Sequence, residues 1–592
     1  MLKALYDYGI REQLALPAGY VNKTITAYIT FSGDTFIGIY KGDSTAVPCP
    51  DIGSLANGKT KSNVLVEKRS VVLPDEPNAK SDFFLEALHA ASAYEPQLNI
   101  CVSALESQEL SETIRSELDK QKIKPGDRLS FRVDGENIVA SKQITAWWQE
   151  FRKQFLPTAE APDDLCLITG KPTVPMVTTP PIQGLYSVGG HGRGDALICF
   201  DKDAFCSYDL KQAANAPVSE ESFSVVKAAL DDLLKDAPIL AGMKFVHWYD
   251  RKIEKEDDPI FSEDFGFGVL DNFEDAENVP PVNEYAERRK ADSVPKSVLS
   301  GKKASDLDDT TYHILLLSGV NGRVMVRRYD RGNYADLRRN IGQWYQDLAL
   351  TNPYGIAPVK PCKLTARLLR LLKYQKTRKN PFDDLKDELS GITPMIIHAI
   401  LTDSPLPDSV AAKSLAYIRS VQLSDEENKQ NQIAYACQWL KVWLIRKANN
   451  EHQEVSLMKY YNFSVPNLAY HCGGVMAVFA AIQETAMPDV NTGIIERYYA
   501  SAIQSPALVI GQLSSRSVFH LEKMENKWLA NYYREKLQEI STALGADVPA
   551  TLNLEQQSYF ALGYYQMGAK LRHERLEKIA EKKQKDNMKE EQ

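Results

Sequence analysis

The sequence predicts an α+β protein: a mixed α/β N-terminal region with β-hairpins, followed by a C-terminal α-helical bundle. Three observations predict it. Short β-rich runs flank glycine-containing turns in the first part of the chain, amphipathic helical runs fill the last part, and 592 residues far exceed one domain. About two to four folding units are expected. We place the boundaries at 1–250, 251–310, 311–400 and 401–592.

Three hairpins are predicted in the first 332 residues. Residues 24–40 hold two β-rich runs around a Ser-Gly-Asp turn, and residues 127–141 repeat this around Asp-Gly. Residues 312–332 give the strongest signal, because Asn321-Gly322 supplies the positive φ angles of a tight turn between two strands. Residues 251–310 are acidic and contain prolines, which indicates an insert or linker with weak packing and high mobility.

The composition argues against several classes of protein. No window approaches the roughly 18 apolar residues of a membrane span, and the N-terminus lacks the order of a secretory signal, so we expect a cytoplasmic protein. Eight cysteines and nine histidines are dispersed without a CxxC or HExxH motif. We therefore expect no disulfide framework, no protein-bound metal and no cofactor.

Positive charge is concentrated in one window of an acidic chain. The formal net charge is −8, whereas residues 323–379 contain fourteen Lys or Arg against three Asp, a net charge of +11, which leaves −19 for the rest. A solvated helix face is the ordinary interpretation, but such faces usually interleave acids at helical spacing. A hairpin and a following helix, with leucines on one arc and Lys363, Arg367 and Arg370 on another, would form a basic wall for a polyanion.

Two other segments carry groups suited to phosphate. The glycines of "GGHGRG" at 189–194 let a backbone approach a phosphate closely, although a flexible hairpin tip between two strand-like runs is the alternative. In the second segment, residues 59–63, Lys59 and Lys61 lie just before a short predicted strand and form a corner that would face a phosphate. The predicted nucleic-acid-binding residues are Lys59, Lys61, Asn63, Gly190, His191, Gly192, Arg193, Arg323, Arg327, Arg328, Arg331, Lys363, Arg367 and Arg370.

Several short sequence segments, taken in their order along the chain, resemble those of a known family. They include "MLKALYDY", "CLITGKP", "LLLSGVNGRVMVRRYDRG" and "RYYASAIQSPALVIGQL", and the most specific are "NAPVSEE" at 215–221 and "FALGYYQ" at 560–566. Together they resemble the large subunit of the type I-C CRISPR surveillance complex, Cascade, of the Csd family. The resemblance runs from residue 1 to about Met567.

The resemblance implies a subunit without catalytic activity that lies near the 5′-handle end of the guide RNA. Such subunits recognise the protospacer-adjacent motif on duplex DNA, help to open it into an R-loop, guide the displaced strand, and help to recruit a helicase-nuclease for antiviral defence. The implied partners are guide RNA, target DNA, and the backbone and guide-processing subunits. The C-terminal bundle resembles a Cascade small subunit, which internal translation from Met476, or alternatively Met458, would supply.

Two rival interpretations remain at the level of sequence. Asp408, Glu427 and Lys429 imitate the acid-acid-lysine pattern of magnesium-dependent nucleases, but Glu427 and Lys429 fall at a helix start instead of on the adjacent strand that such a site requires. A structural scaffold, whose bundle only binds proteins, is the other. The base sequence of the motif, the stoichiometry of the complex and the production of the internal fragment stay open.

Overall fold

The computed structural model describes residues 1–53, 59–155, 164–206, 210, 212–254, 257–260, 307–360, 362–375, 381–424, 428–454, 457–488, 493–545 and 547–590. The chain forms two compact units. The first comprises Met1–Asp236 and Gly319–Met325, and the second comprises Ala237–Ser318 and Val326–Gln592. Most of the acidic stretch for which we predicted mobility, residues 255–256 and 261–306, lies outside the described residues.

A five-stranded mixed sheet organises the described part of the first unit. Its strand order is β3-β2-β6-β5, with β7 also paired to β6, and β2 runs parallel to β6. A second pair joins β1 to β4, and a third joins β8 to β9. The strands are β1 (Tyr20–Thr24), β2 (Ala27–Ser32), β3 (Thr35–Lys41), β4 (Ala46–Pro50), β5 (Glu67–Lys68), β6 (Arg128–Val133), β7 (Glu136–Asn137), β8 (Asp164–Leu165) and β9 (Pro172–Thr173).

Helices pack on this sheet and on one another. Ser141 precedes α6, which buries Trp147 and Trp148 in the core, and α5 packs against β3. The helices are α1 (Leu2–Arg11), α2 (Arg69–Val72), α3 (Ala79–Ser92), α4 (Leu98–Glu106), α5 (Gln108–Lys120), α6 (Lys142–Phe151) and α7 (Glu220–Lys235).

The second unit joins a four-stranded sheet to a helical bundle. The sheet order is β10 (Ile239–Leu240), β11 (Met243–Tyr249), β12 (Thr311–Val320) and β13 (Arg323–Asn333). The helices that follow are α10 (Tyr334–Leu348), α11 (Leu364–Leu368), α12 (Pro381–Leu389), α13 (Thr393–Thr402), α14 (Asp408–Gln422), α15 (Lys429–Asn450), α16 (Leu468–Ala486), α17 (Ile494–Ala502), α18 (Pro506–Lys523), α19 (Lys527–Leu544) and α20 (Leu554–Glu590).

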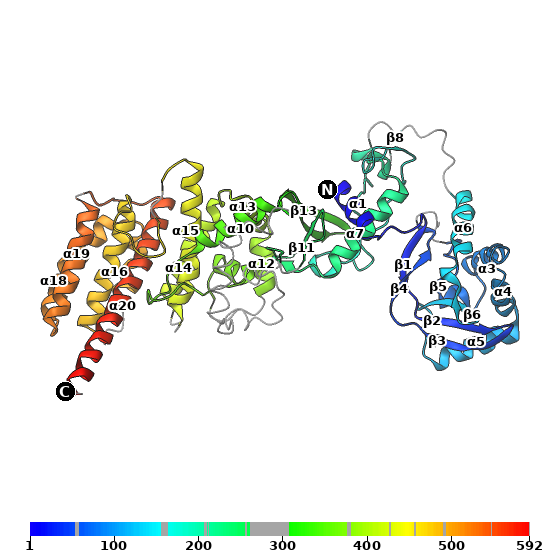
Figure 1. Cartoon of the computed structure of the whole chain (residues 1–592), viewed down its shortest axis with the longest axis horizontal. Coiled ribbons are helices and arrows are strands. Elements are labelled where there is room, and N and C mark those ends of the chain that lie inside the picture. The colour runs from blue at the N-terminus through cyan, green and yellow to red at the C-terminus, as the bar shows by residue number, and fades with distance from the viewer. Residues whose placement is uncertain are drawn as a thin grey trace. The chain divides into compact units, whose positions relative to one another are not determined.

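The fold class predicted from sequence is confirmed. The three hairpins form where expected, as β2–β3, β6–β7 and β12–β13, and their turn residues have the required positive φ angles, including 52° at Asn321 and 78° at Gly322. The C-terminal part is helical, with α14, α15, α16, α18, α19 and α20 running side by side (Figure 1). In the described part of the chain, none of the helices has the length and apolar character needed to cross a membrane.

Helices α16 and α20 meet backbone to backbone at two glycines. A Cβ atom on Gly473 would lie 2.0 Å from the Phe560 carbonyl oxygen, and one on Gly563 would lie 2.0 Å from the Tyr470 carbonyl oxygen. Only hydrogen fits at these positions. Around this contact the aromatic side chains of "FALGYYQ" are core residues, with Phe560 and Tyr565 fully buried.

Helix α15 is buried, and its polar side chains bind the ends of neighbouring elements. The Arg446 guanidinium, 1% exposed, pairs with Asp347 at 3.2 Å and Asp403 at 3.1 Å and donates to the Ala399 carbonyl. Lys441 Nζ donates to the Asp347 carbonyl at 2.9 Å. Because a buried charge needs such partners, these bonds fix where α10 and α13 end against α15.

We predict that Arg446→Met destabilises the second unit by about 3–5 kcal/mol, since it leaves the buried Asp347 carboxylate without its cation. Urea unfolding measures the loss, and hydrogen exchange of α15 peptides locates it. Arg534→Met, which removes an exposed arginine of α19 bonded to Asn531, is the control and should change stability by no more than about 0.5 kcal/mol. Equal effects of the two variants would contradict the prediction.

A second prediction concerns pH. Burial lowers the pKa of Lys441 from 10.5 to about 8, and the Asp347 carboxylate opposes this shift. Between these values the unfolded chain holds one more proton than the folded chain, so the contribution of Lys441 to stability increases as the pH rises from about 8 to about 10.5. As the pH rises over this range, the free energy of unfolding of the wild type should therefore increase relative to that of Lys441→Met.

The control for this pH effect lies on the same helix. The pKa of Lys447 is raised, mainly by its hydrogen bond to Glu555. Comparison of the wild type with Lys447→Met should therefore show no such gain between pH 8 and pH 10. A gain of the same size in both comparisons would assign the effect to groups other than Lys441.

Candidate nucleic-acid interface

The glycine loop at 189–194 is held by buried residues at its base. It follows a 3-10 helix, Tyr186–Val188, and the Gly190 N–H donates to the Leu185 carbonyl at 2.8 Å. Leu185 and Val188 are buried. The segments on either side of the loop, which we expected to be strands, do not form strands. They are paired only by isolated β-bridges, between Ile182 and Asp195 and between Ala196 and Arg323. The loop is nevertheless a hydrogen-bonded structure.

A fully buried carboxylate fixes the shape of this loop. Asp195 is 0% exposed, and its two oxygens accept the His191 N–H at 3.1 and 3.2 Å. The Arg193 N–H in turn donates to His191 Nδ1 at 3.1 Å, which leaves the proton of the neutral imidazole on Nε2. The side chains of His191 and Arg193 are exposed. The loop therefore offers a hydrogen-bond donor and a cation to solvent.

The loop packs against the tip of the β12–β13 hairpin, within the first unit. A Cβ on Gly319 would lie 2.2 Å from Gly190 Cα, so the two backbones touch. The Ala196 N–H donates to the Gly322 carbonyl at 2.8 Å, and the Val324 N–H donates to the Ala196 carbonyl at 3.0 Å. Two segments that sequence reasoning treated separately, the glycine loop and the basic hairpin, thus form one surface, which we call the loop–hairpin surface (186–196 and 319–325).

Arg323 supplies a second guanidinium to the loop–hairpin surface. It is exposed and pairs with exposed Asp201 at 3.2 Å. Because both partners are about half exposed, this ion pair stabilises the fold little and can exchange Asp201 for another anion. His191, Arg193 and Arg323 are therefore three predicted residues that the structure brings together.

The other arginines of β13 lie in the second unit. Arg327 is exposed and donates from Nε to Ser318 Oγ at 2.8 Å, and Arg331 is exposed. Arg328 is half-buried and bonds the buried Asp330 carboxylate at 2.7 Å. Arg328 thus already has a carboxylate partner, whereas Arg327 and Arg331 present charge to solvent along an edge strand.

The basic helix expected after the hairpin differs from the prediction. Only Leu364–Leu368 is α-helical, followed by a 3-10 turn, and Arg367 and Arg370 are both 5% exposed. Arg367 Nη1 donates to Gln438 Oε1 at 2.5 Å, and Arg370 Nη1 donates to the Ala366 carbonyl at 2.8 Å. Neither guanidinium reaches the surface in this structure, so their part in nucleic-acid binding stays a prediction. Lys363 is half-buried, and Lys376, Arg378 and Lys379 lie outside the described residues.

The corner at residues 59–63 is only partly open. Lys59 is exposed, while the Lys61 ammonium lies 4.3 Å from the centre of the Phe155 ring. Asn63 uses both ends of its amide, since Oδ1 accepts from the Ile52 N–H and Nδ2 donates to Glu67 at 2.8 Å. Asn63 therefore shapes the turn, and the nucleic-acid role of this corner stays a prediction.

The residues of the rival nuclease are distributed over helices. Asp408 begins α14 and Lys429 begins α15, where its ammonium lies 4.0 Å from Glu496. Glu427 lies outside the described residues. Among the residues that the structure describes, no group of three or more His, Cys, Asp or Glu side chains is placed to hold a metal ion.

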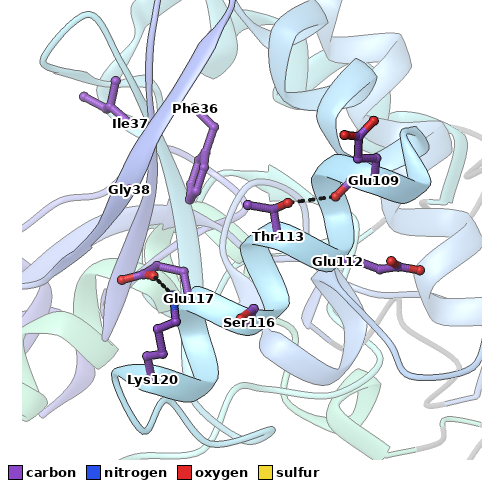
Figure 2. Close-up of a pocket in the computed structure, with 9 residues that line it drawn as sticks. All are labelled: Phe36, Ile37, Gly38, Glu109, Glu112, Thr113, Ser116, Glu117 and Lys120. Carbon is purple, nitrogen blue, oxygen red and sulfur yellow. Dashed lines mark hydrogen bonds and ion pairs between the residues drawn. The ribbon is translucent and has the colours of Figure 1, made fainter.

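A hollow of about 670 Å³ opens between α5 and β3 in the first unit (Figure 2). Glu109, Glu112 and Glu117 project from α5 around it, and Lys120 is paired with Glu117 at 3.2 Å. Three carboxylates against one paired cation repel phosphate. This hollow is therefore no part of the candidate interface.

Comparison with known families decides the wider class. The family model of the CRISPR-associated protein (Cas_Csd1) matches residues 4–571, nearly the whole chain. The chain belongs to the Cas_Csd1 family. This confirms the resemblance to the large subunit of type I-C Cascade drawn from the sequence. Membership implies that this Cas_Csd1 protein works with other CRISPR-associated proteins and a guide RNA. A search of curated proteins gave no match.

Sequence reasoning missed two residues of the loop–hairpin surface of this Cas_Csd1 protein. Asp195 holds the loop from beneath, and Tyr186, at its base, is 77% exposed. The aspartate follows the glycine loop directly in the chain, and that position was a usable signal because Asp often bonds backbone amides in turns. No sequence pattern distinguishes an exposed tyrosine from a buried one.

We predict that Gly319→Ala loosens the glycine loop, because the added methyl would overlap Gly190. Hydrogen exchange of peptides covering 186–196 should become faster, while the rest of the first unit keeps its protection. Gly342→Ala, in α10, is the matched control: its Cβ meets nothing within 4 Å, and the helix should be slightly stabilised. Unchanged exchange in the loop of Gly319→Ala would show that the contact is not needed for loop structure.

Proposed function

We propose that this chain acts as a non-catalytic, DNA-binding large subunit of a type I-C Cascade in the cytoplasm. In this role it recognises the protospacer-adjacent motif on target duplex DNA, helps to open the duplex, guides the displaced strand and helps to recruit the helicase-nuclease. Its partners would be guide RNA, target DNA, and the backbone and guide-processing subunits. The family match carries this proposal, and the exposed cations of the loop–hairpin surface support it.

The charge distribution supports a local phosphate track. The chain as a whole carries −8, so nucleic acid is repelled from most of the protein and attracted where exposed arginines gather. We assign phosphate contacts first to exposed residues, which are His191, Arg193 and Arg323 in the first unit and, separately, Arg327 and Arg331 in the second. Arg367 and Arg370 would have to leave Gln438 and Ala366 to reach a phosphate, so we expect them to support the fold.

A glycine at the tip of the loop gives the same surface a means of approaching the duplex. Gly192 carries no side chain that would hold a sugar-phosphate chain away, whereas Gly189 and Gly190 lie against Gly319 and let the loop pack on the hairpin. In RNA-guided recognition, base pairing with the guide reads the target, and protein reads only a short duplex motif. His191, with its Nε2 proton, is a group that could donate to a base edge in the groove.

A small subunit is also among the proposed partners. Met476, the internal start suggested by the sequence, lies within α16, whereas Met458 lies before that helix. A fragment that begins at Met476 would lack Gly473 and hence the closest contact of α16 with α20. This favours Met458 on packing grounds, and the mass of a co-purifying fragment would identify its first residue.

We predict that replacing Arg193 and Arg323 together by alanine weakens binding to a mixed-sequence DNA duplex and lowers the slope of log Kd against log salt by about 2. Each lost guanidinium removes about one phosphate contact. The affinity is measured by filter binding across a salt series. Lys120→Ala with Lys153→Ala makes the same charge change on exposed, carboxylate-paired lysines of the first unit and should leave the slope unchanged.

Two outcomes would overturn the proposal. An unchanged salt slope in the Arg193/Arg323 variant would remove the phosphate track from this surface and favour a scaffold. Magnesium-dependent cleavage of labelled DNA that disappears in Asp408→Ala would make the protein a nuclease.

A further inference from the structure

Tyr186 is placed unusually for an aromatic side chain. It is 77% exposed, the largest value among the exposed large hydrophobic residues of the described chain. A single exposed apolar residue is ordinary on a protein surface. The surroundings of Tyr186 are what distinguish it.

The backbone that carries Tyr186 is fixed. Leu185 and Val188 on either side are buried, and the Val188 N–H donates to the Leu185 carbonyl at 3.0 Å. The Tyr186 carbonyl accepts the Gly189 N–H at 3.4 Å. The ring is therefore held out into solvent by an ordered turn, so little conformational freedom remains to be lost when a ligand binds.

The ring lies beside the glycine loop. A Cβ on Gly192 would be 4.0 Å from Tyr186 Cδ2, so the backbone between His191 and Arg193 runs next to the ring. Among the described residues, the ring stacks on no other aromatic group and its hydroxyl has no hydrogen-bond partner. A flat apolar face thus stands beside the loop backbone that carries a guanidinium and an imidazole.

This combination of groups matches an unpaired nucleotide. Aromatic rings stack on exposed bases irrespective of sequence, while cations hold the phosphates on either side. A base inside a duplex has both faces covered by its neighbours and offers none to a protein ring. A protein partner would also find an apolar contact here, but the adjacent cations and glycines favour a phosphate-bearing chain.

We infer that Tyr186 stacks on an unpaired nucleobase of a strand whose phosphates contact Arg193 and Arg323. The inference rests on the proposed function. It extends that function from contacts with nucleic-acid phosphates to a contact with a base. The unpaired nucleotide could belong to an opened DNA strand or to RNA, since the stacking chemistry is shared.

The test uses the full chain and short labelled single strands of mixed sequence, one of DNA and one of RNA, with a blunt DNA duplex as comparison. Tyr186→Ala and Tyr186→Leu should raise the Kd for the preferred single strand roughly tenfold, because leucine is apolar but lacks a flat face. Tyr186→Phe should stay within about twofold of the wild type. Duplex affinity should change in none of the three variants. Tyr94→Ala, an exposed tyrosine elsewhere in the first unit, is the control and should bind as the wild type does.

The outcomes separate this inference from the function on which it rests. If Tyr186→Ala binds single strands as well as the wild type while the Arg193/Arg323 variant binds weakly, stacking is wrong and the phosphate track stands. If neither variant loses affinity, the nucleic-acid function fails at this surface as well. Full affinity in Tyr186→Leu would reduce the contact to a general apolar one and overturn stacking. If the affinity loss is seen with the DNA strand, the stacked nucleotide belongs to DNA; if it is seen with the RNA strand, the nucleotide belongs to RNA.

Discussion

The ion pair between Arg446 and Asp347 is the constraint on which the second unit depends. In a low-dielectric interior neither charge is tolerated alone, and the pair ties α15 to the end of α10. Around it, Lys441 bonds the Asp347 carbonyl, Gln438 bonds the Leu348 carbonyl, and Trp439 bonds the Arg367 carbonyl. A helix without a solvated face thus acquires one defined orientation, because its polar groups find acceptors in only one arrangement.

The same network explains where the sequence interpretation falls short. Counting charges in residues 323–379 shows an excess of cations, but it does not show that Arg367 faces Gln438 from the buried α15, 71 residues later in the chain. Burial of an arginine depends on distant acceptors, and a count of local acids does not contain them. The hairpins, in contrast, were predictable, since Asn321-Gly322 and Asp134-Gly135 encode their turns within two residues.

The loop–hairpin surface shows a second limit of sequence reasoning. Its two halves were both identified as cation-bearing, glycine-containing segments, yet their contact joins Gly190 to Gly319, far apart in the chain. Close approach of two glycine backbones leaves no pattern of hydrophobicity or charge. The exposed fraction of Tyr186 is also a property of the folded surface. Residue types thus indicated the chemistry, and the fold supplied the arrangement that makes it one surface.

The glycine contact between α16 and α20 restricts how these helices can slide. A shift by one helical turn, about 5.4 Å, would bring the side chain of Tyr559 or Met567 to the place where Gly563 meets the Tyr470 carbonyl. No side chain fits there, so the pair has a single permitted axial alignment. Tension on the far end of α20 would accordingly pass to α16 without slippage, and the two helices would move as one rigid rod.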